Sequence, residues 1–256
     1  SGQAKKYKGA EIISADSRQV YKGLDIGSGK ITKKEMRGVP HHLLDVASPK
    51  KVFTVQDFKK LGQEAMSDIA TRKKIPIVCG GTGFYIDALV SDLKIPEVLP
   101  NWKLRKELEK KLTEELFAIL KKLDSRRAKN IDPKNKRRLI RAIEIVKITK
   151  KPVPSLSFKA PEKNVLFLGL TLPKEILKKR IEKRIKKMLK KGLIKEVENL
   201  RKIGLTWKRI QELGFEYKYP ALYLQKKISQ KQMLASLKTE NWRYAKRQMI
   251  CFRRNK

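Results

Sequence analysis

Short apolar runs alternate along the chain with longer stretches in which apolar residues recur every three or four positions. The short runs predict strands at residues 10–15, 42–46, 75–79 and 165–172. The first long stretch predicts a helix over residues 55–72, with Thr54 as its N-cap and Asp57 in its first turn. Strands that alternate with helices are typical of an α/β domain with a mostly parallel sheet.

The strand pattern stops between residues 96 and 160, where two charged amphipathic helices are predicted at about 101–123 and 135–149. Prolines mark both ends of this stretch. Because a strand is predicted again at 165, we interpret residues 96–160 as a helical insertion. The α/β core then comprises residues 1–95 and 161–256.

The last part of the core, residues 174–254, is predicted to be almost wholly helical. Within residues 174–191 there are ten Lys or Arg. Leu177, Ile181, Ile185 and Met188 form a stripe that is predicted to dock on the core. The opposite face of that helix would then be basic.

The net charge of the chain indicates what class of partner it binds. The chain has 63 Lys and Arg against 26 Asp and Glu, a formal net charge of +37. Such an excess favours a polyanionic partner, nucleic acid first, although any single lysine run can equally be a solvated helix face. No apolar run is long enough to span a membrane, and the two cysteines have no metal-ligand spacing, so we expect a soluble, cytoplasmic protein.

Two polar residues follow predicted strands directly. Asp16 closes the first strand, and Thr82 lies in the glycine-rich turn after the strand at 75–79. Ligands of open α/β sheets bind at the carboxyl ends of the strands, and N–H groups at strand-to-helix turns bind oxyanions. The alternatives, equally weighted from the local pattern alone, are that Asp16 caps the next helix and that Thr82 belongs to a plain tight turn.

Other polar groups are less distinctive. His41 and His42, followed by Asp45, would point to opposite faces of a strand, which argues against a metal site. Arg138 and Arg141 share one helix face and suit a phosphate clamp or a solvated surface equally well. The run from Lys246 to Gln248 has the same two interpretations.

Eight segments occur in an order that resembles the bacterial tRNA dimethylallyltransferases of the IPP transferase family. They are IISADSRQVY (12–21), GLDIGSGK (23–30), GVPHHLLD (38–45), PIVCGGTGFY (76–85), DPKNKRRLIRAIE (132–144), RIEKRIKKMLKKG (180–192), QELGF (211–215) and YAKRQ (244–248). The resemblance implies a P-loop-NTPase-like parallel sheet with an all-helical inserted domain. It also implies transfer of a dimethylallyl group from its diphosphate to N6 of the adenosine 3′ to the anticodon.

The resemblance assigns roles to individual residues. Asp16 matches the carboxylate that takes the N6 proton, and Thr82 matches the threonine at the reacting centre, near the bridging oxygen of the diphosphate. Both are also expected to contact the flipped base. The tRNA anticodon stem-loop is expected to meet a larger set, namely Ser17, Arg18, Gln19, Arg105, Arg137, Arg138, Leu139, Ile140, Arg141, Gln211, Gly214, Phe215, Glu216, Lys246, Arg247 and Gln248. The protein is expected to be a monomer.

The sequence also departs from the family pattern. The family's GxxxxGK[ST] phosphate-binding loop, which helps to hold Mg²⁺, does not occur here, so we expect the chain by itself to be inactive. Glu216, Trp242, Ile250 and Cys251 replace residue types that are usual in the family. Two rival functions therefore stay open: a non-catalytic RNA-binding remnant, and an adenylate dimethylallyltransferase, against which the helical insertion and the high charge argue.

Overall fold

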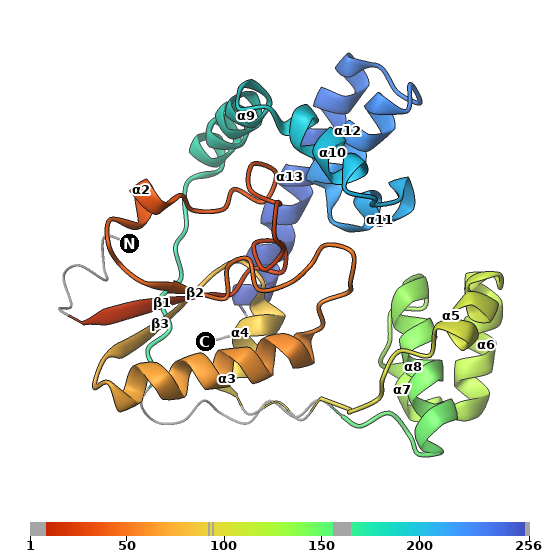
Figure 1. Cartoon of the computed structure of the whole chain (residues 1–256). Coiled ribbons are helices and arrows are strands. Elements are labelled where there is room, and N and C mark those ends of the chain that lie inside the picture. Colours follow the sequence, from red (N-terminus) through yellow and green to blue (C-terminus); the bar gives the residue numbers. More distant parts are fainter. Residues whose placement is uncertain (1–8, 92, 94, 156–164, 254–256) are drawn as a thin grey trace. The chain divides into compact units, whose positions relative to one another are not determined.

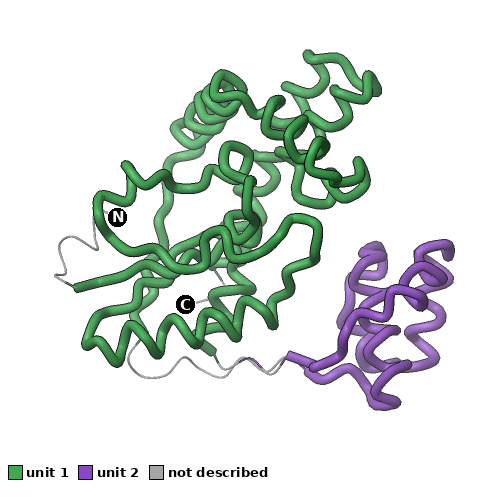
Figure 2. Tube along the Cα trace, in the orientation of Figure 1, with its two compact units in different colours: residues 1–92, 160–256 green, residues 93–159 purple. Residues whose placement is uncertain are grey.

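The computed structural model describes residues 9–91, 93, 95–155 and 165–253. The chain divides into two compact units, which Figure 2 colours separately. Unit 1 comprises residues 1–92 and 160–256, and unit 2 comprises residues 93–159. No helix in the described part of the chain is both long and apolar enough to cross a membrane.

Unit 1 contains a parallel three-stranded sheet in the order β2-β1-β3. The strands are β1 (Ala10–Ser14), β2 (His41–His42) and β3 (Ile75–Cys79). Ile12 lies opposite His41 on one side and Ile77 on the other. The predicted α/β class with a parallel sheet is confirmed.

Helix α3 (Val55–Thr71) covers one face of this sheet (Figure 1). It begins as predicted, because the Thr54 hydroxyl accepts a hydrogen bond from the Asp57 N–H while the Asp57 carboxylate accepts one from the Thr54 N–H. Its Phe58 is fully buried and stacks on Tyr85 with ring centroids 4.1 Å apart. Tyr85 belongs to α4 (Gly83–Val90), so α3 and α4 share a core with the sheet.

The C-terminal part of unit 1 is helical as predicted. Ile185 and Met188 of the predicted apolar stripe are buried, and Ile181 is partly buried. The remaining helices of this unit are α2 (Lys33–Met36), α9 (Lys174–Lys190), α10 (Leu193–Lys202), α11 (Trp207–Glu212), α12 (Phe215–Leu224) and α13 (Gln230–Phe252).

Two strand predictions are wrong. Residues 165–172 form no strand, and Leu166, Leu168 and Leu170 are exposed. Apolar alternation permits a strand, but a strand also needs a neighbour for its backbone hydrogen bonds, and no described strand pairs with this segment. The strand predicted at 42–46 ends at His42, because Leu43 and Asp45 adopt left-handed backbone conformations with φ of 63° and 57°.

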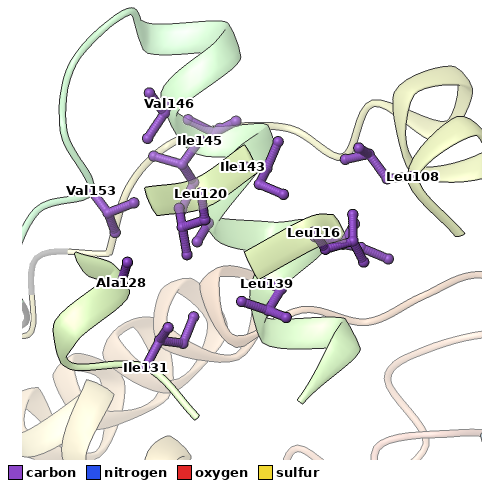
Figure 3. Packing of buried hydrophobic residues seen from close by; sticks show 13 residues of the cluster. Leu108, Leu116, Leu120, Ala128, Ile131, Leu139, Ile143, Ile145, Val146 and Val153 are labelled. Atoms are coloured by element: carbon purple, nitrogen blue, oxygen red, sulfur yellow. The ribbon is translucent and has the colours of Figure 1, made fainter. Parts of the chain in front are cut away.

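In its described part, unit 2 consists of helices joined by loops, without a strand. It contains α5 (Trp102–Glu109), α6 (Thr113–Leu123), α7 (Ser125–Lys129) and α8 (Lys136–Thr149). The single helix predicted at 101–123 is thus two helices, and α6 starts anew where Glu115 accepts a hydrogen bond from the Leu112 N–H at 2.6 Å. The helix predicted at 135–149 is confirmed. Figure 3 shows the aliphatic core of this unit, in which Leu116, Leu120 and Ile143 are fully buried.

Candidate active site

Asp16 and Thr82 meet where two neighbouring strands end. Parallel strands β1 and β3 carry their C-terminal residues to the same edge, and the Ala15 N–H donates to the Cys79 carbonyl at 2.9 Å. The chain beyond Cys79 then turns back, since the Thr82 N–H donates to the Ala15 carbonyl at 3.1 Å. The Thr82 hydroxyl in turn accepts a hydrogen bond from the Ser17 N–H at 3.1 Å.

Glycine is required in this turn for steric reasons. A Cβ atom at Gly80 would lie 2.2 Å from the Ala15 carbonyl oxygen, and one at Gly81 would lie 2.1 Å from Nε2 of Gln248. The contact at Gly80 is with backbone and cannot be relieved, whereas the Gln248 side chain could move away from a Cβ at position 81 only by losing its hydrogen bond to the Gly81 carbonyl. The glycines therefore let the turn approach β1 on one side and α13 on the other.

Asp16 organises the turn that follows β1. Its Oδ1 accepts hydrogen bonds from the N–H groups of Arg18 at 2.7 Å and Gln19 at 3.2 Å. No helix follows directly, because residues 17–20 form a turn and the next helix starts at Lys33, so the helix-capping alternative is wrong. Among the described residues, no hydrogen bond reaches Oδ2, which leaves this oxygen able to accept a proton.

Charged groups of both signs lie near Asp16. Burial raises the pKa of Glu216 to about 7, although the nearby Arg184 and Arg18 act in the opposite direction. Arg18 and Glu216 both lie close to Gly214, which has a φ of 134°. A Cβ added at Gly214 would lie 3.5 Å from both the Arg18 Nε and a Glu216 carboxylate oxygen. The site therefore combines two carboxyl groups with two guanidinium groups.

Helix α13 closes one side of the glycine-rich turn. Gln248 donates from Nε2 to the Gly81 carbonyl at 2.8 Å and to the Tyr244 hydroxyl at 3.0 Å. Burial raises the pKa of Tyr244 to about 12, so its hydroxyl stays protonated at neutral pH. The Tyr244 ring lies 6.0 Å from that of Phe215, in a tilted arrangement. The YAKRQ segment thus contributes Tyr244 and Gln248 to the site.

Lys246 and Arg247 are exposed on the same helix. Lys246 lies over the ring of Trp242, with its Nζ 5.4 Å from the centroid. Gln211 is partly buried just before the turn that leads into α12. The tRNA contacts predicted for these residues stay predictions.

The arginines of unit 2 divide into two groups. Glu144 is fully buried and accepts hydrogen bonds from Arg105 and Arg141 at 2.6–2.8 Å, and from the Asn101 N–H at 2.7 Å. Burial alone would raise the pKa of Glu144, but these hydrogen bonds outweigh it and the pKa lies below its ordinary value. Arg105 and Arg141 are therefore structural ion-pair partners as well as candidate tRNA ligands.

Arg137 and Arg138 form the second group, because both are exposed and make no ion pair within the described part of unit 2. Their neighbours Leu139 and Ile140 are 0% and 7% exposed and belong to the core of the unit, where Figure 3 shows Leu139. Their burial argues against side-chain contacts with tRNA, and the contacts predicted for these two residues stay predictions. The clamp predicted for Arg138 and Arg141 stays a prediction, although Arg141 is already paired with Glu144.

The Mg²⁺ implied by the resemblance finds no ligand cluster here. No group of three or more His, Cys, Asp or Glu side chains that could hold a metal ion lies within the described residues. His42 is 2.7 Å from Glu11, and His41 is 2.8 Å from the Val39 carbonyl oxygen. No step is assigned to the ion.

One group that contacts the loop supporting the site has no signal in the sequence. Glu196 of α10 is 9% exposed and accepts hydrogen bonds from three consecutive N–H groups of the loop 23–30. A glycine-rich loop signals N–H groups that need an acceptor. The sequence gives no sign that the acceptor lies some 170 residues further along the chain.

Comparisons with known proteins identify relatives over nearly the whole chain. The family model described as IPP transferase matches residues 19–255. The tRNA dimethylallyltransferase 2 of Treponema denticola is 43% identical over 254 residues, which are 97% of this chain and 85% of that protein. The solved tRNA isopentenylpyrophosphate transferase of Bacillus halodurans is 36% identical, with a TM-score of 0.70 over 99% of this chain and 80% of that one.

A eukaryotic dimethylallyltransferase, solved as it acts on tRNA, has a TM-score of 0.76 and 27% identity over 96% of this chain and 64% of its own. The similarity therefore spans both units, and the family model includes Thr82 but begins after Asp16. On this evidence the chain belongs to the IPP transferase family.

Proposed function

We propose that the protein is a tRNA dimethylallyltransferase, which transfers the dimethylallyl group of dimethylallyl diphosphate to N6 of the adenosine 3′ to the anticodon. The observation that carries the proposal is the meeting of Asp16 and Thr82 at the ends of β1 and β3. Family membership and the similarity to a dimethylallyltransferase acting on tRNA support it. Such a substrate implies a cytoplasmic location.

The reaction needs both a base and a stabilised leaving group. The lone pair of adenine N6 is delocalised into the ring, so N6 becomes a good nucleophile only as it loses a proton. In our proposal N6 forms a bond to the dimethylallyl C1, and the bond from C1 to the diphosphate oxygen breaks. The N6 proton passes to Asp16, and the diphosphate leaves with the bonding electron pair.

Asp16 suits the role of base because Oδ1 is fixed by two N–H groups while Oδ2 accepts no hydrogen bond from described residues. Thr82 would lie near the bridging oxygen of the diphosphate, where a hydroxyl can donate to developing negative charge. Its hydroxyl already accepts from Ser17, so its own proton is available for donation. The two groups thus have complementary tasks.

The tRNA must bring its base out of the stack to reach this site, as in other enzymes that act on nucleobases. Ser17, Arg18 and Gln19 would line the mouth of the site. The exposed Arg137 and Arg138 of unit 2, and Lys246 and Arg247 of unit 1, would contact phosphates, which position a nucleic acid without reading its sequence. The net charge of +37 favours this large substrate over a free nucleotide.

The two rival functions predict different products. The full chain is incubated with dimethylallyl diphosphate and either an unmodified tRNA transcript or AMP, and the nucleosides are analysed by mass spectrometry. We expect dimethylallylated adenosine from the tRNA only. A product from AMP alone would show an adenylate dimethylallyltransferase, whereas tRNA binding without any product would show an RNA-binding remnant. The predicted inactivity of the chain finds no support in the comparisons.

A further inference from the structure

The loop of residues 23–30, GLDIGSGK, has the composition of an anion-binding loop. Successive backbone N–H groups in a glycine-rich turn form a concave nest that attracts negative charge. In this protein the N–H groups of residues 25–28 point to two side chains of the C-terminal helices, Glu196 of α10 and Tyr217 of α12. The nest is therefore already filled from within the chain.

Both oxygens of the Glu196 carboxylate are used. Oε2 accepts from the N–H groups of Asp25 at 3.0 Å and Ile26 at 2.7 Å, and Oε1 accepts from the Gly27 N–H at 2.9 Å. Oε1 also accepts from the Tyr217 hydroxyl at 3.0 Å. Four donors on one buried carboxylate are as many as its lone pairs can take, so Glu196 satisfies the nest as a bound anion would.

Tyr217 completes the arrangement. Its hydroxyl oxygen accepts from the Ser28 N–H at 3.1 Å. Burial and the neighbouring Glu196 raise the pKa of Tyr217, so the hydroxyl stays protonated and donates to the carboxylate. A Cβ atom at Gly27 would lie 2.6 Å from the Tyr217 ring, which explains why a glycine is present at this point of the loop.

The loop is tied in turn to the chain beside Asp16. Lys30, whose side chain is 6% exposed, donates from Nζ to the Tyr21 carbonyl at 2.9 Å and to the carboxylates of Asp25 at 2.7 Å and Asp45 at 2.5 Å. The Asp45 N–H donates to the Gln19 carbonyl at 3.2 Å. A continuous set of hydrogen bonds thus links the filled nest to the segment that follows Asp16.

A second connection reaches the charged groups of the site. A Cβ atom at Gly29 would lie 3.1 Å from a terminal nitrogen of Arg184, so the guanidinium group rests on the backbone of the loop. Arg184 is one of the two arginines that act on Glu216. A shift of the loop would therefore displace both Gln19 and Arg184.

From this geometry we propose that Glu196 is a positioning residue for the transfer reaction: its carboxylate is a built-in anion that holds the loop, and through the loop the residues beside Asp16. The proposal rests on the proposed function, because the measurement of kcat assumes that the protein modifies tRNA. It further requires that the nest, once emptied by a substitution, binds a small carboxylate in place of Glu196.

The test is chemical rescue of Glu196→Ala. Acetate replaces the methylene and carboxylate that this substitution removes. We expect kcat for tRNA modification to fall about ten- to a hundredfold, the typical cost of misplacing reacting groups by about 1 Å. The KM for tRNA should change less. Acetate should restore activity several-fold, whereas chloride at equal ionic strength, which controls for weaker tRNA binding in salt, should not.

Glu198→Ala is the matched control, because Glu198 lies on the same helix and, among the described residues, forms a surface ion pair with Lys195 at 3.2 Å and no contact with the loop. It should keep wild-type kcat and show no response to acetate. Circular dichroism must first show that Glu196→Ala is folded. The positioning role is wrong if the folded variant keeps kcat within about twofold of the wild type, or if its activity responds equally to chloride and acetate.

Amide hydrogen exchange gives a readout that does not depend on activity. The N–H groups of Asp25, Ile26 and Gly27 should exchange slowly in the wild type and faster in Glu196→Gln, which keeps one carbonyl oxygen and is used if the Ala variant fails to fold. Acetate should slow the exchange again in Glu196→Ala. Slow exchange unchanged in Glu196→Gln would overturn the proposal, whereas a wild type without activity would overturn only the proposed function.

Discussion

Glu196 of unit 1 and Glu144 of unit 2 are buried carboxylates that are held in different ways. In unit 1, Asp16 and Glu196 accept hydrogen bonds mainly from backbone N–H groups, and each fixes the course of a loop. In unit 2, Glu144 accepts mainly from the side chains of Arg105 and Arg141 and fixes one helix against another. The arrangement in unit 1 shapes a site. The arrangement in unit 2 pairs two of the arginines that would otherwise be available to bind a polyanion.

This difference shows why the number of basic residues in the sequence is larger than the number that a polyanionic partner can contact. Arg105 and Arg141 are matched by a carboxylate that is fully buried, so part of their charge is neutralised within the unit. Arg137 and Arg138, one turn away from Arg141 on α8, are exposed. The basic face of unit 2 is thus smaller than the arginine count indicates.

The largest effect is expected at the chemical centre of unit 1. Asp16→Ala should lower kcat for tRNA modification by roughly two to four orders of magnitude, because it removes a positioned base. tRNA affinity, measured by filter binding, should stay near the wild-type value. Asp16→Asn retains the acceptor for the turn but not the base, and should be as inactive as the Ala variant. An Asn variant with near wild-type kcat would assign Asp16 a purely structural role.

The next effect is expected at Glu144 in unit 2. Glu144→Ala leaves Arg105 and Arg141 without their buried partner and should cost about 3–5 kcal/mol of stability, measured by urea unfolding. The pKa of Glu144 is lowered in the folded state, so its contribution is present above its ordinary pKa of 4.5 and is lost as the pH falls below that value. Stability of the variant should therefore depend less on pH in the acidic range. An unchanged unfolding midpoint would contradict the structural role.

A smaller effect separates the two arginine groups. Replacing Arg137 and Arg138 by Ala should leave stability unchanged and make the slope of log affinity against log salt shallower by about 1.4–1.8, at about 0.7–0.9 for each released contact. Arg141→Ala is the matched comparison on the same helix, and it should lower stability while changing the slope less. The phosphate-contact assignment fails if the double variant keeps the wild-type slope.

The smallest effect concerns Glu216 in unit 1. Because its pKa is raised to about 7, the folded protein holds this proton more tightly than the unfolded chain does, and stability decreases as the pH rises from 4.5 to 7. Glu216→Gln cannot ionise and should remove this decrease, with a gain of about 1 kcal/mol at pH 8 after allowance for solvent screening. Equal pH dependence of thermal unfolding in the variant and wild type would show that Glu216 is ordinarily ionised.

The sequence predicted those elements that are determined locally. The capping pair of Thr54 and Asp57 marks the start of α3, and the run at 75–79 is long and apolar enough to mark β3. The convergence of Asp16 and Thr82 is expected only from the family resemblance, and the structure explains it because β1 and β3 are adjacent parallel strands that end at one edge. These features depend on residues close to each other in the chain or on a general rule of sheet topology.

The features that sequence analysis missed depend on distant partners. Nothing near Glu196 indicates that it binds a loop early in the chain, and nothing near Arg105 indicates that it pairs with Glu144, 39 residues later. The segment at 165–172 shows the same limit, because alternation describes a strand's faces but not its hydrogen-bonding neighbour. Long-range pairing decided each of these cases.

The hydrogen bond from Gln248 to Gly81 has a consequence for the order of events during synthesis. Its two residues lie 167 positions apart, so the glycine-rich turn leaves the ribosome long before α13 is made. The helices of unit 2 pack mainly on sequence neighbours and can form during that interval, since local contacts form fast. We therefore expect a nascent chain to acquire a folded helical insertion first, and a closed reaction centre only after the ribosome has passed codon 248.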